Sequence, residues 1–174
     1  YVGAVLMDLS KAFDCLPHGL LVAKLNAYNV SSNSCKLIAS YLSNRKQRVK
    51  VSNCKSPWRQ IAKGVPQGSG LGPLLWNIFM NDIFFFMKDT CLLNYADDNT
   101  NYISSKCPDT VISKLQSDGL TAIKWFSLNG LKANPSKFQT IFLKPKRLAD
   151  PFPNHLNLEG ENIIREDTVK LLGI

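Results

Sequence analysis

The sequence has few of the residues that build disulfide frameworks, zinc sites and hydrolytic triads. Its five cysteines are odd in number and widely spaced, and no C-x-x-C motif occurs. This pattern argues against a disulfide framework or a zinc site and favours a reduced intracellular compartment. The two histidines, His18 and His155, lie far apart in the sequence and offer neither a catalytic triad nor a pair of metal ligands.

Long apolar runs and acidic residues are also scarce. The run from Ile78 to Met87 is too short to span a bilayer and contains Asp82. Only 13 Asp and Glu residues oppose 21 Lys and Arg residues, which gives a net charge of +8. Such a balance points to an acidic partner, either nucleic acid or an anionic membrane surface. No basic amphipathic helix supports the membrane alternative.

The length of 174 residues predicts one domain with a real hydrophobic core. A hydrophobic content of 45% and a charged content of 20% are ordinary for a globular domain. The chain begins without Met and both of its ends read as apolar strands. We therefore expect it to be a piece of a larger protein.

The hydrophobic pattern alternates between the periods of strands and helices. Strands interleaved with helices, including at least two hairpins, predict an α+β fold with a mostly antiparallel sheet. The expected strands are Val2 to Met7, a basic hairpin within residues 44–65, a hairpin around residue 97, Gln139 to Lys144, a hairpin of Leu156 to Leu158 with Ile163-Ile164, and Val169 to Leu172; the expected helices start at Pro17, Ser34, Leu71 and Pro108.

Two adjacent carboxylates, Asp97 and Asp98, stand between two apolar β-type segments. Taken alone, this stretch favours a hairpin turn, because Asp and Asn dominate turns. The alternative is a site for Mg²⁺, Mn²⁺ or Ca²⁺, which prefer oxygen ligands.

A third carboxylate, Asp8, ends the first apolar strand. If that strand neighbours the hairpin, three carboxylates meet at one edge of a sheet. Three carboxylates can hold two divalent ions about 3.5–4 Å apart and so promote an in-line phosphoryl displacement. The ions would relieve the repulsion between Asp97 and Asp98.

Five ordered blocks resemble the palm of reverse transcriptases of the non-LTR (LINE-type) retrotransposon group. They are "DLSKAFD", "GVPQGSGLGPLLWNIF", "YADD", "NGLKANPSKFQTIF" and "VKLLGI". The resemblance runs from the first residue to the last. The resemblance implies a two-layer, ferredoxin-like palm over residues 1–174, with fingers, thumb and endonuclease in the rest of the parent polyprotein. It also implies an RNA template, a DNA primer, dNTPs, two Mg²⁺ ions with Mn²⁺ as a substitute, and a place in nucleus and cytoplasm.

The resemblance also assigns roles to single residues. Asp8, Asp97 and Asp98 match the metal-binding aspartates, and Lys137 matches a lysine that assists the pyrophosphate leaving group. Phe13 matches the bulky residue under the sugar of the incoming nucleotide, where a ring excludes a 2′-hydroxyl. The residues that match positions beside the nascent base pair are Gln67 and Gly68.

Three further features bear on binding. The basic stretch Arg45, Lys46, Arg48 and Lys50 is expected to contact phosphates. Asp14 is expected to be structural, as a helix cap or an ion-pair partner. Gly70 departs from the family, whose members usually carry an apolar β-branched residue there.

Two alternatives remain at the level of sequence. An RNA-templated RNA polymerase would use the same carboxylates, but those enzymes favour Gly-Asp-Asp and lack a bulky residue at the position of Phe13. A non-catalytic nucleic-acid-binding remnant of a decayed element would fit the charge, although the three aspartates are intact.

Overall fold

Residues 1–171, which the computed structural model describes, divide into two units. The first consists of Tyr1–Ser10 and the chain from Asn81 onward, and the second of Lys11–Met80. Each has buried side chains of its own.

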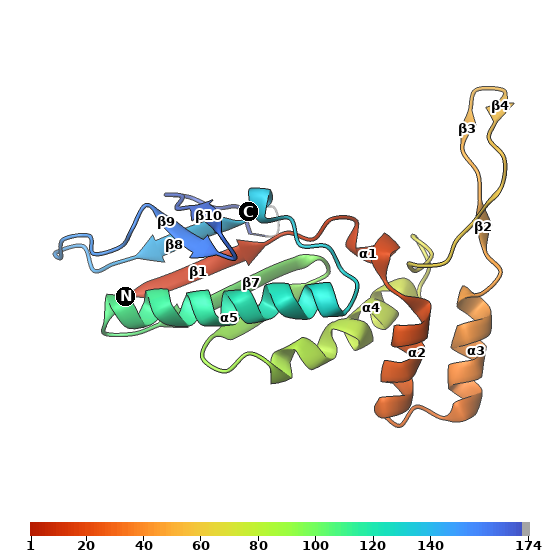
Figure 1. The fold of residues 1–174 in the computed structure, drawn as a ribbon, viewed down its shortest axis with the longest axis horizontal. Coiled ribbons are helices and arrows are strands. Elements are labelled where there is room, and N and C mark those ends of the chain that lie inside the picture. The colour runs from red at the N-terminus through yellow and green to blue at the C-terminus, as the bar shows by residue number, and fades with distance from the viewer. Residues whose placement is uncertain (172–174) are drawn as a thin grey trace. The chain divides into compact units, whose positions relative to one another are not determined.

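The first unit contains an antiparallel sheet with the strand order β6-β7-β1-β8 (Figure 1). Its strands are β1 (Val2–Met7), β6 (Cys91–Tyr95), β7 (Asp98–Ser104) and β8 (Gln139–Leu143). In β1 the buried residues alternate with half-buried ones, because successive side chains of a strand point to opposite faces. Gly3, Val5 and Met7 therefore face the core, whereas Leu6 faces the other side.

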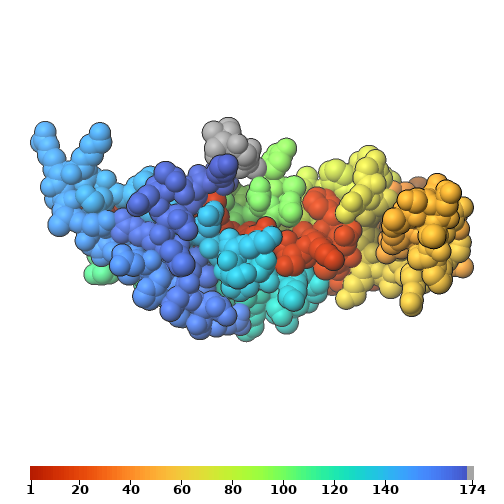
Figure 2. Space-filling model, turned by 90° about the horizontal axis from the view of Figure 1, so that it is seen from above, coloured from red at the N-terminus to blue at the C-terminus, as the bar shows by residue number. Residues whose placement is uncertain are grey.

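A long helix, α5 (Pro108–Leu128), lies along one face of this sheet (Figure 1). Its apolar residues recur at helical spacing, so that one face is buried, including Leu115, Ala122 and Phe126. The hairpin of β9 (His155–Leu158) and β10 (Glu161–Ile164) packs beside α5. The segment from β8 to β10, blue in Figure 2, forms a broad part of the surface of this unit. Two 3₁₀ helices, η1 (Asn81–Phe85) and η2 (Pro135–Lys137), complete the unit.

The second unit is helical, with a two-stranded projection. Helices α3 (Ser32–Leu42) and α4 (Gly72–Met80) pack against α2 (His18–Ala27), and the short α1 (Ala12–Cys15) precedes them. Lys24 is buried among them, where its ammonium group donates to the carbonyl of Phe79 at 2.8 Å. The projection pairs β2 (Lys46–Gln47) with β5 (Arg59–Gln60), and β3 (Lys50–Val51) with β4 (Cys54–Lys55).

The predicted α+β fold with a mostly antiparallel sheet is confirmed. The strand expected from Val169 to Leu172 is wrong as far as the structure describes it, because residues 168–171 form no strand; Leu172 lies outside the described residues. In the long helix, Val111 is fully buried and the predicted Ile112 only partly. None of the helices within residues 1–171 has the length and apolar character needed to cross a membrane.

Candidate active site

The site begins where β1 ends, at Asp8. Beyond Met7 the chain leaves the sheet and pairs with the segment before η2: the amide of Asn134 donates to the carbonyl of Asp8 at 3.0 Å. This pairing brings Lys137 to the end of β1. Its ammonium nitrogen lies 3.5 Å from Oδ2 of Asp8, with 66% of the lysine side chain and 35% of the aspartate side chain exposed. An ion pair as open to water as this one contributes little to stability.

The two adjacent carboxylates lie at the tip of the β6–β7 hairpin, so the predicted turn is confirmed. Tyr95 pairs with Asp98, which leaves Ala96 and Asp97 as the two-residue loop. Ala96 has φ of 54°, a left-handed conformation that costs a residue with a Cβ about 1–2 kcal/mol.

Two asparagines hold this strained turn in place. Asn94 and Asn99 face each other across the hairpin, and Nδ2 of Asn94 donates to Oδ1 of Asn99 at 2.7 Å. Nδ2 of the buried Asn99 in turn donates to the carbonyl of Asp97 at 2.9 Å. The turn that carries Asp97 and Asp98 is therefore tied to the strands beneath it.

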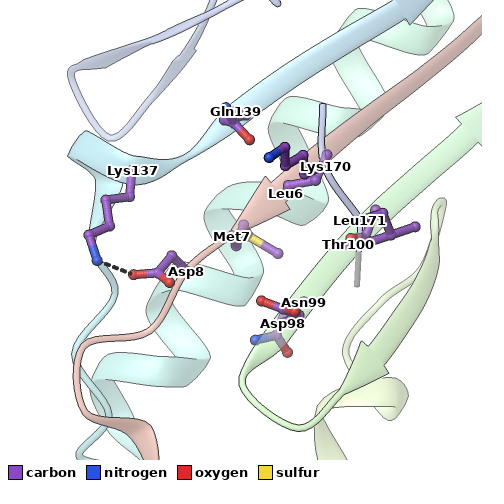
Figure 3. Close-up of a pocket in the computed structure, with 10 residues that line it drawn as sticks. All are labelled: Leu6, Met7, Asp8, Asp98, Asn99, Thr100, Lys137, Gln139, Lys170 and Leu171. Atoms are coloured by element: carbon purple, nitrogen blue, oxygen red, sulfur yellow. Dashed lines mark ion pairs between the residues drawn. The ribbon is translucent and has the colours of Figure 1, made fainter. Parts of the chain in front are cut away.

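Asp8 directly follows β1, Asp98 begins the neighbouring β7, and both face one cavity (Figure 3). Met7 pairs with Asn99, so the next residues along each strand, Asp8 and Asp98, follow at the same edge. The cavity has a volume of about 380 Å³. Its other lining residues are Leu6, Met7, Asn99, Thr100, Lys137, Gln139, Lys170 and Leu171.

The carboxylates interact electrostatically. Partial burial raises the pKa of Asp98 above its ordinary value, and the charges of Asp97 and Asp8 raise that pKa further. The loss of a proton from Asp98 is thus opposed by its two neighbours, and a cation placed among the three would remove that opposition.

The fit of these residues to divalent metal follows from this repulsion. Carboxylate oxygens are the ligands that Mg²⁺ and Mn²⁺ prefer, and the charges of Asp97 and Asp8 both act on Asp98. Within residues 1–171 as they stand, however, no three His, Cys, Asp or Glu side chains lie close enough together to hold a metal ion. Asp97 lies in the turn and does not line the cavity, so convergence of all three carboxylates stays a prediction.

We predict that Asp98→Asn makes the metal-free chain more stable at neutral pH. Because the pKa of Asp98 is raised in the folded state, that state binds the proton more tightly than the unfolded state does. The stability that Asp98 contributes is therefore fully present below its ordinary pKa of 3.8 and is lost as the pH rises through the raised value. The gain from Asn should stay below about 1 kcal/mol, since the side chain is exposed and screened.

Urea unfolding of wild type and variant in EDTA measures this difference. It should be present at pH 7 and should shrink as pH falls towards 4. Asp89→Asn is the matched control, because Asp89 forms an ion pair with Lys114 at 2.8 Å and its neutralisation should bring no gain. A less stable Asp98→Asn variant at pH 7 would show that the repulsion is not a dominant force at this residue.

The predicted nucleotide-contacting residues belong to the second unit. Phe13, Gln67 and Gly68 line one cavity of about 420 Å³ beside the glycine-rich loop. Phe13 is half-buried and its ring packs on Trp76, with centroids 4.8 Å apart. Phe13 therefore packs partly in the core, which fits a structural role, and partly lines the cavity, which fits a role in binding.

The glycine-rich loop is fastened to α1 by its backbone. The amide of Gly64 donates to the carbonyl of Leu16 at 2.7 Å, and the amide of Val65 donates to the carbonyl of Phe13 at 2.9 Å. Asp14 is neither a cap nor an ion-pair partner in the contacts that the structure gives it, which corrects the expectation. Its carboxylate accepts a hydrogen bond from Nε2 of Gln67 at 3.2 Å.

The basic stretch lies on the two-stranded projection. Lys46, Arg48 and Lys50 are exposed, and Arg45 is half-buried at its base. Nη1 of Arg45 is 3.4 Å from the carbonyl of Gly64, so Arg45 also supports the loop. Whether these residues contact nucleic acid stays a prediction.

Several residues of the first unit escaped the sequence reasoning. Gln139 and Lys170 line the cavity, and their only signal was their presence in the "NGLKANPSKFQTIF" and "VKLLGI" blocks. Asp118, buried in α5, accepts hydrogen bonds at 2.8–2.9 Å from the amides of Asp89 and Thr90 and from the hydroxyl of Thr90. Asp118 thereby fixes the start of β6, but an Asp within a helical pattern gives no sign of this.

Comparison with known proteins agrees with this geometry. Residues 1–174 match the family described as "Reverse transcriptase (RNA-dependent DNA polymerase)". The chain is 34% identical to the probable RNA-directed DNA polymerase from transposon BS of Drosophila melanogaster, and 29% identical to the RNA-directed DNA polymerase from mobile element jockey of the same species. Both alignments cover the whole of this chain but only 20% and 19% of those proteins.

Solved structures show the same fold at low sequence identity. The telomerase of Candida albicans matches with a TM-score of 0.62 at 14% identity, over 94% of this chain and 29% of that one. Apo telomerase from Candida Tropicalis, truncated from its C-terminal domain, matches with a TM-score of 0.61 at 18% identity, over 94% of this chain and 34% of that one.

Proposed function

We propose, from the premise that this chain belongs to the reverse transcriptase family and is related to non-LTR retrotransposon enzymes, that its parent is an active RNA-directed DNA polymerase. It adds deoxynucleotides to the 3′-hydroxyl of a DNA primer on an RNA template. The observation that carries this proposal is the cavity at the edge of β1 and β7, which Asp8, Asp98 and Lys137 line and where Lys137 pairs with Asp8.

The residues at this edge would divide the work of phosphoryl transfer. Asp8, Asp97 and Asp98 would hold two Mg²⁺ or Mn²⁺ ions. When bound, such ions lower the pKa of an attacking hydroxyl and stabilise charge on the leaving oxygens. The raised pKa of Asp98 supports this assignment, because partial burial and the charges of Asp97 and Asp8 all oppose its ionisation, and a bound cation would offset that opposition.

Lys137 would act on the leaving group. Its exposed ammonium is held near the cavity by Asp8 at 3.5 Å and is free to turn towards a pyrophosphate. A cation in that position stabilises the charge that develops there and has a proton to donate.

The second unit would supply the nucleotide contacts. Phe13 would lie under the deoxyribose, and Gln67 would lie beside the nascent base pair. Gly68 has φ of 77°, and no atom would lie within 4 Å of a Cβ built on it, which leaves its backbone open to a ligand. The hydrogen bond from Gln67 to Asp14 supports its role, because it orients the glutamine side chain.

We predict that Phe13→Val in the parent raises the incorporation of ribonucleotides. The smaller side chain opens space for a 2′-hydroxyl, and one such steric contact is worth about 10- to 200-fold in discrimination. The measurement is the ratio of kcat/KM for dNTP over NTP. An unchanged ratio would leave Phe13 as a core residue packed on Trp76.

Phe13→Tyr is the matched control for that experiment. It keeps the ring and its packing on Trp76, and so should keep selectivity close to that of the wild type. A wild-type parent that preferred NTPs from the outset would favour the RNA-templated RNA polymerase alternative.

The rest of the machinery belongs to other parts of the parent. We propose that residues 1–174 are its palm portion and that fingers, thumb and an endonuclease lie elsewhere in the polyprotein. The small share of its relatives that this chain spans, 20% in the first case, leaves room for them.

Primer extension by the full-length parent tests the proposal. A DNA primer on an RNA template should be extended with dNTPs in Mg²⁺ and in Mn²⁺. A parent that binds this substrate but adds no nucleotide would support the non-catalytic remnant instead.

A further inference from the structure

The projection of the second unit, residues 45–63, is here named the arm. Figure 1 shows it as a long two-stranded ribbon that extends beyond α3. Every residue from 46 to 60 is exposed, so the arm buries none of its side chains. Only two short ladders hold it, Lys46–Gln47 with Arg59–Gln60 and Lys50–Val51 with Cys54–Lys55. Core packing does not account for its composition.

All charged residues of the arm are positive. Between Asn44 and Gly64 the sequence contains no Asp or Glu. Lys50 and Lys55 stand directly opposite each other in the β3–β4 ladder. Like charges in that position destabilise a strand pair, and a polyanion laid along the arm would offset the repulsion. Its cations are Arg45, Lys46, Arg48, Lys50, Lys55, Arg59 and Lys63.

An aromatic platform accompanies this charge. The guanidinium of Arg48 lies over the ring of Trp58, 4.5 Å from its centroid. Trp58 is 57% exposed, whereas Trp76 and Trp125 are buried. A large exposed aromatic among cations is the combination that binds single-stranded nucleic acid, since the bases stack and the phosphates pair.

We propose that the arm binds a single-stranded stretch of RNA template, with bases stacked on the Arg48–Trp58 pair and phosphates contacted by the arm's lysines and arginines. The choice of RNA template as the occupant rests on the proposed function. An anionic membrane is the weaker fit, because insertion of Trp58 would carry the guanidinium of Arg48 out of water.

Tryptophan fluorescence of residues 1–174 tests this directly. The chain has three tryptophans and only Trp58 is substantially exposed, so base stacking should quench Trp58 while Trp76 and Trp125 act as internal references. A 12-nucleotide oligo-U RNA is titrated in EDTA, which makes the result independent of metal and catalysis. An abasic 12-mer is expected to bind by charge without quenching.

Variants separate stacking from charge. Trp58→Leu should abolish the quenching and weaken oligo-U binding about 5- to 150-fold, the range for loss of one stacked base. The dependence of oligo-U binding on salt should be the same in this variant as in the wild type. Lys50→Gln should instead lower the slope of log affinity against log salt by about 0.7, the value for one single-strand phosphate contact. Trp58→Phe should retain most of the affinity, and Lys36→Gln on α3 should change nothing.

Three results would overturn the proposal: no quenching by oligo-U, preferential binding of oligo-dT, or binding of phosphatidylserine vesicles with a blue shift of Trp58 and no response to RNA. Trp58 is exposed on an arm without a core, so its substitution should leave the circular dichroism of the chain unchanged. If oligo-U quenches Trp58 but the parent extends no primer, only the polymerase proposal is refuted. If the parent extends a primer but oligo-U does not quench Trp58, only the arm proposal is refuted.

Discussion

In the full-length parent protein, Asp97→Asn is expected to abolish primer extension and to leave template binding largely intact. The substitution removes a carboxylate from the turn at the tip of the β6–β7 hairpin, where the charges of Asp97 and Asp8 already act on Asp98. Loss of this proposed metal ligand would remove several kcal/mol of stabilisation of the transition state, so the rate should fall by about 10³-fold or more. Contacts to the phosphate backbone come from other residues and should persist.

Single-turnover extension of a DNA primer on an RNA template measures the rate, and filter binding measures the template. Asp8→Asn should have the same effect, because Asp8 lines the cavity. Asp89→Asn removes an equal charge from the same unit, at an ion pair with Lys114 instead of the cavity, and should remain active. Full activity of the Asp97→Asn parent would refute the assignment of the carboxylates.

The largest expected effect on stability comes from Gly64→Ala. Gly64 has φ of 81°, and a Cβ added there would lie 2.7 Å from Cα of Asp14 and 2.8 Å from the carbonyl oxygen of Phe13. These atoms belong to backbone that is itself hydrogen-bonded to the loop, so neither side moves cheaply. The left-handed conformation costs about 1–2 kcal/mol and overpacking about 1–3 kcal/mol more.

A series of three glycines in the same loop separates these two costs. Gly68→Ala meets only the conformational cost, because Gly68 has φ of 77° but open space around it. Gly70→Ala meets neither, and should be neutral or slightly stabilising. Urea unfolding should therefore give a destabilisation of about 2–5 kcal/mol for Gly64→Ala, about 1–2 kcal/mol for Gly68→Ala and about zero for Gly70→Ala. Equal effects at Gly64 and Gly68 would show that the loop is not clamped against α1.

Gly70 bears on the departure from the family pattern. The resemblance implies an apolar β-branched residue at this position, and the open space around Gly70 shows that the fold does not demand glycine. Nothing in the structure explains why glycine stands here.

Most elements were predictable because their signal is local. The buried strand Val2–Met7, the hairpin at Asp97 and the long helix from Pro108 each follow from hydrophobic period and turn chemistry within a short window. The strand expected from Val169 failed because an apolar run becomes a strand only where it pairs with a neighbour, and the run itself does not show whether it pairs. Residues 168–171 form no strand in the described part of the chain.

The site was predictable only in part, and for a related reason. The resemblance to a family named Asp8, Asp98 and Lys137, but their meeting depends on β1 pairing with β7 and on Asn134 pairing with Asp8, contacts between residues far apart in the chain. Asp118 could not have been found in this way. A buried Asp and an exposed Asp look alike in a helical pattern, and only the amides of Asp89 and Thr90 distinguish them.

The sequence by itself determined most of the element types, the turn at Ala96–Asp97, the positive charge of the arm and the family, because each depends on neighbouring residues or on ordered motifs. Only the tertiary structure decided which charges meet. It placed Lys137 against Asp8, raised the pKa of Asp98 through partial burial and its two charged neighbours, and left Trp58 exposed under Arg48 while burying Trp76 and Trp125. Burial and the distance between charges set these energies, and both arise only when distant segments pack together.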